Sequence, residues 1–259
     1  MSEPQVLSYT IYNSPGTETI LLIHGAFGNS AEWDQVLPSL SKTHHILTPD
    51  LPAHGASSHI PFTVDLSAKL ILDLITEHAH NARAHIVGYS LGAHVAARVA
   101  EFAAPGQVSS LIACGYNSFT PPKMVIPFLS PVVFMLTHFV LGVTDPRAEW
   151  EVLGMGTCSL ALSGAVVHAL CEGRELGSIS ARTLVVAATG EIFMPNDKLD
   201  SARELFRVVG GGFEGCSRVV QHRGMKHAWL MIDPDLFADM VLDWVEGSEL
   251  SSSFEDVQV

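Results

Sequence analysis

Short apolar segments alternate with segments of helical periodicity along most of this chain, and this alternation limits the fold more than any other feature. The apolar runs have the length and composition of buried strands and cover residues 7–12, 19–24, 44–49, 84–88, 108–114 and 183–188. The segments of helical spacing cover residues 64–79, 91–102 and 235–245. Strands that alternate with helices form a mostly parallel sheet flanked by helices, so the sequence predicts an α/β fold. Functional side chains of such sheets gather at the carboxyl ends of the strands.

The alternation stops between residues 117 and 180. This stretch contains a very apolar segment, 124–143, which two prolines interrupt. The prolines and the lack of charged flanks argue against a membrane span, so we expect an inserted helical cap or lid instead. The core domain would then consist of residues 1–116 and 181–259, with the cap at 117–180.

The end of the chain carries weaker signals. Residues 218–221 form a short run with polar edges, which is typical of an edge strand. The polar, acidic residues 251–259 are expected to fray, as chain termini commonly do.

Charge and composition exclude several classes of protein. The formal net charge is −13 and the basic residues are scattered singly, so the chain offers no positive face to nucleic acid or to anionic lipid. The N-terminus lacks the basic and apolar stretches of a secretory signal, and the four cysteines show no metal-binding spacing. We therefore expect a cytoplasmic protein with free, buried thiols, and nothing in the sequence implies a cofactor or a metal.

The most specific motif is GYSLG at residues 88–92, between an apolar run and a helical segment. A G-x-S-x-G pattern in this context places the serine, Ser90, on a sharp turn with its hydroxyl exposed, which is typical of a nucleophile. The neighbouring strand and helix crowd the flanking positions, so Gly88 and Gly92 must be small. The helix N-terminus adds partial positive charge where an oxyanion would develop. The alternative is a glycine-rich helix start with Ser90 as its N-cap.

The loop HGAFG, residues 24–28, follows a predicted central strand. An oxyanion needs two donors, and these would be the N–H of Leu91, directly after the serine, and an N–H of this loop. For the second donor we take Ala26, with Phe27 as the alternative. We expect His24 to hold the loop in shape through hydrogen bonds rather than to act as a base.

The turn DLPAHGAS, residues 50–57, follows another predicted strand, and we expect Asp50 to fix it by accepting backbone hydrogen bonds. Together with HGAFG, GYSLG and the late segment GMKH at 224–227, this turn resembles the α/β-hydrolase superfamily. The resemblance covers about residues 5–116 and 181–247, with the motifs in the expected order. It implies the α/β-hydrolase fold, with the variable cap of that family between the two parts, but it does not identify the substrate.

The resemblance also implies a base for the serine, because a serine hydroxyl is a poor nucleophile until a base takes its proton. The family places this histidine late, after the last strand, where the chain has His227. His222 is a rival five residues earlier, but it ends a strand-like run, and we interpret it as structural.

The third member of such a site is a carboxylate, which the family usually supplies from the loop after the strand predicted at 183–188. At the usual position in that loop the chain has Phe193, which departs from the family pattern. We therefore rank Asp197 first and Glu191 second, although Asp197 also fits as an N-cap of the next helix. A rarer arrangement places the acid after the preceding strand, but residues 114–118 contain no carboxylate.

These residues predict a serine hydrolase that cleaves a small or medium apolar ester, lactone or thioester through an acyl-enzyme. The apolar cap and the acidic surface favour an apolar small molecule as substrate. Two other functions stay open: C–C bond cleavage by the same triad, and a ligand-binding receptor with little turnover. The residues expected to contact the substrate are Phe27, Tyr89, Met124, Phe128 and Trp229. The sequence does not determine the oligomeric state.

Overall fold

The computed structural model describes the chain except for residues 1–4, 145–158, 172–175, 191–196 and 209–215. The described strands form one sheet of eight, in the order β1-β3-β2-β4-β5-β6-β7-β8. The outermost strands pair antiparallel and the six between them pair parallel, so the predicted α/β fold is confirmed. The strands are β1 (Tyr9–Tyr12), β2 (Thr19–Ile23), β3 (His45–Pro49), β4 (Ala84–Tyr89), β5 (Val108–Cys114), β6 (Arg182–Ala188), β7 (Arg218–His222) and β8 (Glu255–Asp256).

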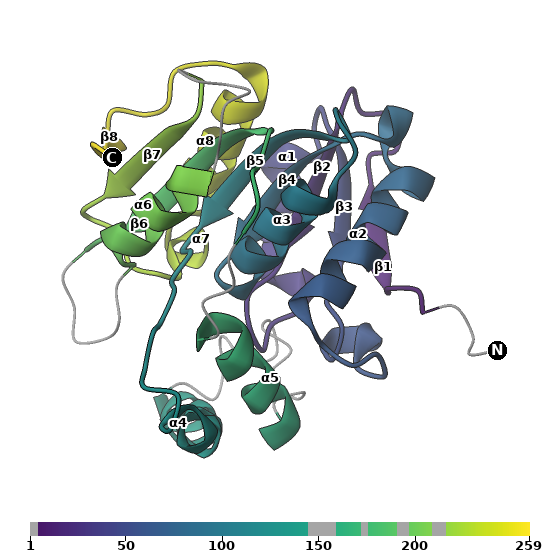
Figure 1. Ribbon diagram of the computed structural model, residues 1–259. Coiled ribbons are helices and arrows are strands. Elements are labelled where there is room, and N and C mark those ends of the chain that lie inside the picture. The colour runs from purple at the N-terminus through teal and green to yellow at the C-terminus, as the bar shows by residue number, and fades with distance from the viewer. Residues whose placement is uncertain (1–4, 145–158, 172–175, 191–196, 209–215) are drawn as a thin grey trace.

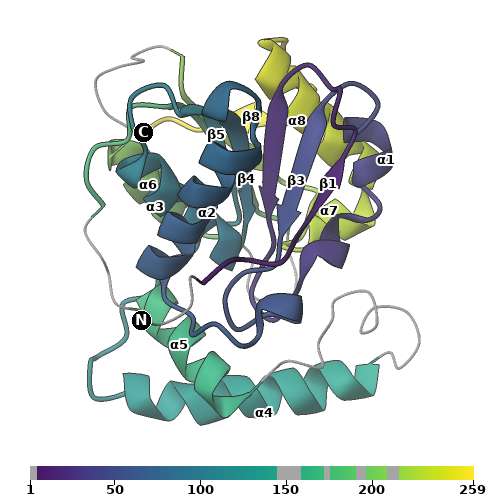
Figure 2. The same ribbon diagram turned by 90° about the vertical axis from the view of Figure 1, so that its right-hand side faces the viewer.

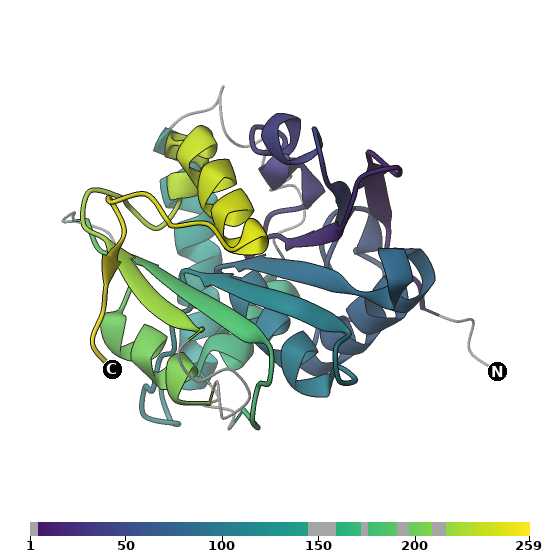
Figure 3. The same ribbon diagram turned by 90° about the horizontal axis from the view of Figure 1, so that it is seen from above.

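Helices cover both faces of the sheet, as the view in Figure 3 shows. On one face lie α2 (Val64–His78), α3 (Leu91–Phe102) and α6 (Leu199–Val208). On the other face lie α1 (Leu37–Leu40) and α8 (Pro234–Glu246), with the short α7 (Trp229–Ile232) beside them. The two hydrophobic cores therefore sit on opposite sides of one sheet.

Strand β2 shows why its sequence is apolar without interruption. Leu21 and Ile23 point into the core beneath α2 and α3, whereas Ile20 and Leu22 point into the core beneath α8. All four side chains are fully buried. Because successive side chains of a strand face opposite ways, a strand buried on both faces must be apolar at every position.

Local capping fixes the ends of the longer helices. Thr63 accepts a hydrogen bond from the N–H of Leu66 and so begins α2, and Asp233 begins α8 in the same way through Leu236. Gly247 ends α8 in the left-handed conformation, with φ 76°, which suits a residue without a side chain.

Between β5 and β6 the chain forms α4 (Ile126–Thr144) and α5 (Leu160–Cys171). The two helices pack against each other below the sheet, at the end where β6 and β7 terminate (Figures 1 and 2). α5 also contacts α3 and so connects this pair to the sheet. Among the residues that the structure describes, no helix is long and apolar enough to cross a membrane.

The C-terminal tail differs from its prediction. Glu255–Asp256 forms β8, which pairs with β7, and Phe254 just before it is 6% exposed. The ring of Phe254 packs against those of His222 and Trp229. Both the frayed tail and the edge position of residues 218–221 are therefore wrong predictions, because burial of this one ring orders the tail along β7.

The cysteines also depart from their prediction. Cys114 is buried at the end of β5, Cys171 is partly buried and Cys216 is exposed. The expectation of buried thiols fails for Cys216 because it lies in the turn before β7 rather than inside the sheet. Cys158 lies outside the described residues.

Candidate active site

Ser90 lies in the turn between β4 and α3, with φ 53° and ψ −116°. This backbone conformation is costly for a residue with a side chain, so it persists only where the surroundings hold it. The N–H of Ser90 donates to the carbonyl of Cys114 on the neighbouring strand, at 2.8 Å. This is the sharp turn that the GYSLG motif predicts.

The two glycines of the motif are required by close backbone approach. A Cβ atom at Gly88 would lie 2.3 Å from the carbonyl oxygen of Gly92. A Cβ atom at Gly92 would lie 2.2 Å from the carbonyl oxygen of Ile23, on β2. These neighbours are backbone atoms of the sheet and helix, and moving them would cost packing energy. Any larger residue would therefore open the turn that presents Ser90.

Three side chains from distant parts of the sequence form one hydrogen-bonded chain. Nε2 of His227 lies 3.0 Å from Oγ of Ser90. Nδ1 of the same imidazole lies 2.5 Å from Oδ1 of Asp197. Ser90 follows β4, Asp197 follows β6 and His227 follows β7. These strands lie in one parallel part of the sheet, with β5 between β4 and β6, so their carboxyl ends bring the three side chains to the same edge.

Asp197 is held in place before α6 begins, and its side chain is 1% exposed. Its Oδ2 accepts a hydrogen bond from the N–H of Ala188, at 2.8 Å. Its carboxylate is therefore directed at Ala188 and His227, and this explains its position better than a role as N-cap. The alternative acid, Glu191, and the departure at Phe193 lie outside the described residues.

His222, the rival base, makes local contacts. Its Nδ1 accepts from the N–H of Gly224, at 3.2 Å, in the turn that follows β7. Its ring meets Phe254 edge-on. These contacts fit the structural interpretation of His222.

Gly115 provides the space that the imidazole occupies. Its φ is +67°, and a Cβ atom there would lie 2.7 Å from Cε1 and 3.0 Å from Nδ1 of His227. Gly115 belongs to no motif of the sequence, and its only signal there is that it directly follows a central strand.

The loop after β2 is shaped by His24, as predicted from its position. Nδ1 of His24 lies 2.8 Å from the carbonyl oxygen of Gly25, and Nε2 accepts from the N–H of Leu51, at 2.9 Å. Burial lowers the pKa of His24 to about 3, so the imidazole is neutral at physiological pH. The neutral ring donates on one side and accepts on the other, as both contacts require.

The two proposed oxyanion donors lie at the ends of the elements that flank Ser90. Leu91 is the first residue of α3, so its N–H has no acceptor within the helix. Ala26 is partly buried in the loop after β2, and Phe27, the alternative, has φ 64°.

Glu32 is a functional candidate that the sequence analysis missed. It is buried, and its Oε2 accepts from the N–H of Gly25, at 2.6 Å. Burial raises the pKa of the carboxyl to about 7, although the bond from Gly25 and the charge of His227 oppose the shift. Its only signal was an acidic residue shortly after the HGAFG loop.

Asp50 fixes the turn after β3, in agreement with its predicted role. Its Oδ1 accepts from the N–H of Ser30 and its Oδ2 from the N–H of Ala56, each at 2.8 Å. The carboxylate therefore joins the turn to the loop after β2 and does not face Ser90.

The residues predicted to contact substrate fall into three groups. Trp229 is 1% exposed and packs against Phe237 in the core, so its prediction is wrong: α7 turns the ring inward. Tyr89 is 5% exposed, and the centroid of its ring lies 5.2 Å from that of His227. The tyrosine therefore packs against the imidazole from the buried side. Phe27 is partly buried, and Met124 and Phe128 are largely exposed, so substrate contact by these three stays a prediction.

Comparison with known proteins agrees with this architecture. A model of the alpha/beta hydrolase family matches residues 20–245. The chain belongs to the α/β-hydrolase family. A Gibberella zeae protein called AB hydrolase superfamily protein is 43% identical over 245 residues, which are 94% of this chain and 85% of that protein.

More distant relatives of this α/β hydrolase include esterases. The pimeloyl-[acyl-carrier protein] methyl ester esterase of Methylococcus capsulatus is 38% identical over 101 residues, 39% of this chain and 38% of that enzyme. An esterase from Exiguobacterium antarcticum has a similar structure, with a TM-score of 0.74 at 14% identity over 93% of this chain and 95% of the esterase. At that identity the likeness concerns the fold alone. Family membership and these relatives support a hydrolase.

Proposed function

We propose that this protein is a serine hydrolase that cleaves a small or medium apolar ester, lactone or thioester. The observation that carries the proposal is the unbroken series of contacts from Oγ of Ser90 through His227 to Asp197. A hydroxyl, an imidazole and a buried carboxylate in this order are the parts that nucleophilic acyl transfer needs.

The reaction begins when Nε2 of His227 takes the proton of the Ser90 hydroxyl and Oγ attacks the carbonyl carbon of the substrate. The carbonyl oxygen becomes an oxyanion, which accepts hydrogen bonds from the N–H groups of Leu91 and Ala26. The imidazolium of His227 then gives its proton to the leaving alcohol or thiol as the tetrahedral intermediate collapses to an acyl-enzyme. A water molecule, deprotonated by His227, attacks the acyl carbon and releases the acid and Ser90.

Asp197 acts through His227 in both steps. Its carboxylate accepts from Nδ1, which leaves Nε2 as the nitrogen that faces Ser90. The negative charge also stabilises the imidazolium that forms when the serine loses its proton. The burial of Asp197 keeps water from competing for this contact.

The substrate class is inferred from the region around α4 and α5, with residues 117–180 proposed as a cap. This region supplies apolar side chains near the end of the sheet that carries Ser90, whereas the net charge of −13 disfavours anionic substrates. The esterase named among the relatives acts on a methyl ester, which belongs to the same chemical class.

The test is a series of p-nitrophenyl esters from acetyl to dodecanoyl, combined with labelling by a fluorophosphonate probe. We expect hydrolysis of short and medium esters, labelling of Ser90, and a loss of about 10⁴-fold or more in kcat for Ser90→Ala.

His222→Gln is the matched control and should retain activity. Activity that survives Ser90→Ala would refute the proposal. An unlabelled Ser90 would favour a binding protein, and turnover of diketones but not esters would favour C–C cleavage.

A further inference from the structure

Asn117 lies after β5, three residues beyond Cys114, and its side chain contacts the proposed acid. Nδ2 of Asn117 donates to Oδ1 of Asp197 at 3.1 Å, and its Oδ1 accepts from the N–H of Lys198 at 2.8 Å. A backbone N–H only donates and an ionised carboxylate only accepts, so these two contacts fix the orientation of the amide. The side chain therefore joins the end of β5 to two consecutive residues before α6.

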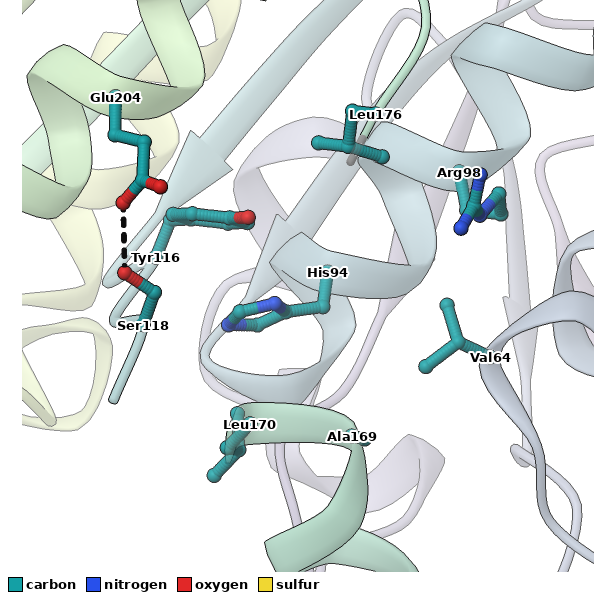
Figure 4. Close-up of a pocket in the computed structure, with 9 residues that line it drawn as sticks. All are labelled: Val64, His94, Arg98, Tyr116, Ser118, Ala169, Leu170, Leu176 and Glu204. Atoms are coloured by element: carbon teal, nitrogen blue, oxygen red, sulfur yellow. Dashed lines mark hydrogen bonds between the residues drawn. The ribbon is translucent and has the colours of Figure 1, made fainter. Parts of the chain in front are cut away.

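The backbone of Asn117 is fixed as well, from the side of α3. Its carbonyl oxygen lies 3.1 Å from Nε2 of His94. Burial lowers the pKa of His94 to about 4, so the imidazole is neutral and Nε2 carries the proton that it donates. Figure 4 shows this ring beside that of Tyr116, and the two rings stack with centroids 4.1 Å apart.

The contact with Asn117 acts on the oxygen of Asp197 that matters most for the imidazole. Oδ1 receives both Nδ1 of His227 and the amide of Asn117, whereas Oδ2 receives the N–H of Ala188. With donors on both oxygens, the carboxylate cannot rotate about its Cβ–Cγ bond without breaking a hydrogen bond. Without Asn117, Ala188 would still hold Oδ2, but the donor left to Oδ1 would be the imidazole of His227 itself, which the carboxylate has to orient.

We propose that Asn117 is a positioning residue, which orients the carboxylate of Asp197 toward His227 and is itself held by His94. This proposal rests on the proposed function, because it assigns Asn117 a part in the same triad. It also explains how the end of β5 contributes to the site although it carries no carboxylate. The position supplies a neutral donor to the acid instead of the acid itself.

The decisive variant is Asn117→Asp. It has nearly the same shape and can still accept from the N–H of Lys198, but it replaces the donor that faces Asp197 with an oxygen. We expect kcat to fall about 10- to 100-fold, because a misplaced triad loses rate even when every member is present. KM should stay within about twofold, because Asn117 does not touch the substrate.

Ser118→Ala is the matched control in the neighbouring residue. The hydroxyl of Ser118 contacts Ser201 and Glu204 on α6, the latter at 2.9 Å as drawn in Figure 4, but it does not contact Asp197. This variant disturbs the same junction between β5 and α6, and its kcat should equal that of the wild type. An equal loss of kcat in both variants would overturn the proposal, since the effect would then come from packing of the junction.

A second measurement does not depend on turnover. The proton on Nδ1 of His227, bonded to Asp197, should give a far-downfield proton NMR resonance that disappears in His227→Gln. We expect Asn117→Asp to shift this resonance and Ser118→Ala to leave it in place, and an unchanged resonance in Asn117→Asp would overturn the proposal. If no ester is hydrolysed, the proposed function fails while this readout still tests Asn117. Asn117→Ala, which adds no carboxylate, serves if Asn117→Asp does not fold.

Discussion

The sheet domain and helix α4 expose their apolar residues to very different degrees. Phe237, on α8, is fully buried against Trp33 and Trp229. Phe128, on α4, is 72% exposed, and Val132 one turn later is 51% exposed. Both helices are rich in apolar residues, so composition alone does not distinguish them.

The two regions differ in how firmly their side chains are held. The residues of the triad follow strands that are packed on both faces, and each polar atom of Asp197 has a specific donor. α4 packs mainly against α5 and turns a stripe made of Phe128 and Val132 toward solvent, and Met124, just before the helix, is exposed as well. The proposed triad therefore lies in the part of the chain whose side chains are most completely packed, whereas α4 leaves much of its apolar surface exposed.

Two phenylalanines, Phe237 and Phe128, should differ most strongly in their contribution to the free energy of unfolding. Phe237→Ala should lower the free energy of unfolding by about 3–5 kcal/mol, because it leaves a cavity in a packed core. Phe128→Ala should change it by less than about 0.5 kcal/mol, because the ring is mostly in water already. Urea unfolding at neutral pH measures both values. Comparable losses in the two variants would show that the stripe on α4 is covered in solution.

The next effect concerns two glycines with positive φ. Gly115→Ala should lower kcat/KM about 100-fold, or about 2.7 kcal/mol, because its Cβ would displace the imidazole of His227. Gly106→Ala is the matched control: its φ is +80°, but nothing lies within 4 Å of the added Cβ. Steady-state ester hydrolysis measures kcat/KM of both variants, and Gly106→Ala should keep the wild-type value. A fully active Gly115→Ala would contradict the placement of His227.

The smallest effect is the response of stability to acid. Burial lowers the pKa of His24 to about 3 and of His94 to about 4, from a usual value near 6.5. The folded state therefore binds fewer protons, so the stabilisation is complete above pH 6.5 and is lost as the pH falls toward 4. At pH 5 each imidazole should cost about 2 kcal/mol of unfolding free energy relative to neutral pH.

The measurement is urea unfolding at pH 7.5 and pH 5. His94→Gln should reduce the difference between the two conditions by about 2 kcal/mol, whereas replacement of the exposed His59 should leave it unchanged. Glu32 acts in the opposite direction, because its raised pKa, about 7, lets the folded state bind a proton first. The difference between His94→Gln and the wild type therefore reports the contribution of this imidazole better than the total change in unfolding free energy of either protein does.

The sequence predicted the elements that are determined by short-range patterns. The limits of α3 and β5 agree with the predicted segments 91–102 and 108–114, because an apolar run bounded by turn residues has few alternatives. Ser90 could be predicted as the nucleophile because its two glycines and its strand–helix context lie within five residues.

The parts that the sequence did not reveal depend on which way a side chain faces in the folded chain. Asn117 meets Asp197 across 80 residues, and an asparagine in a loop carries no pattern that separates this role from an ordinary turn. Glu32 is buried, and its carboxylate accepts from the N–H of Gly25 in the loop after β2, which its position in the sequence does not indicate. Trp229 was predicted to contact the substrate, but α7 directs its ring into the core.

The pairing of β8 with β7 has a consequence for the handling of this protein. Phe254 and the bonds between Arg218 and Asp256 attach the last residues to the sheet, so a chain shortened before Phe254 would lose its outermost strand. β7 would then present unpaired N–H and C=O groups, which invite edge-to-edge association with another molecule. Residues 254–256 therefore belong to the folded sheet and should be kept when the protein is shortened for experiments.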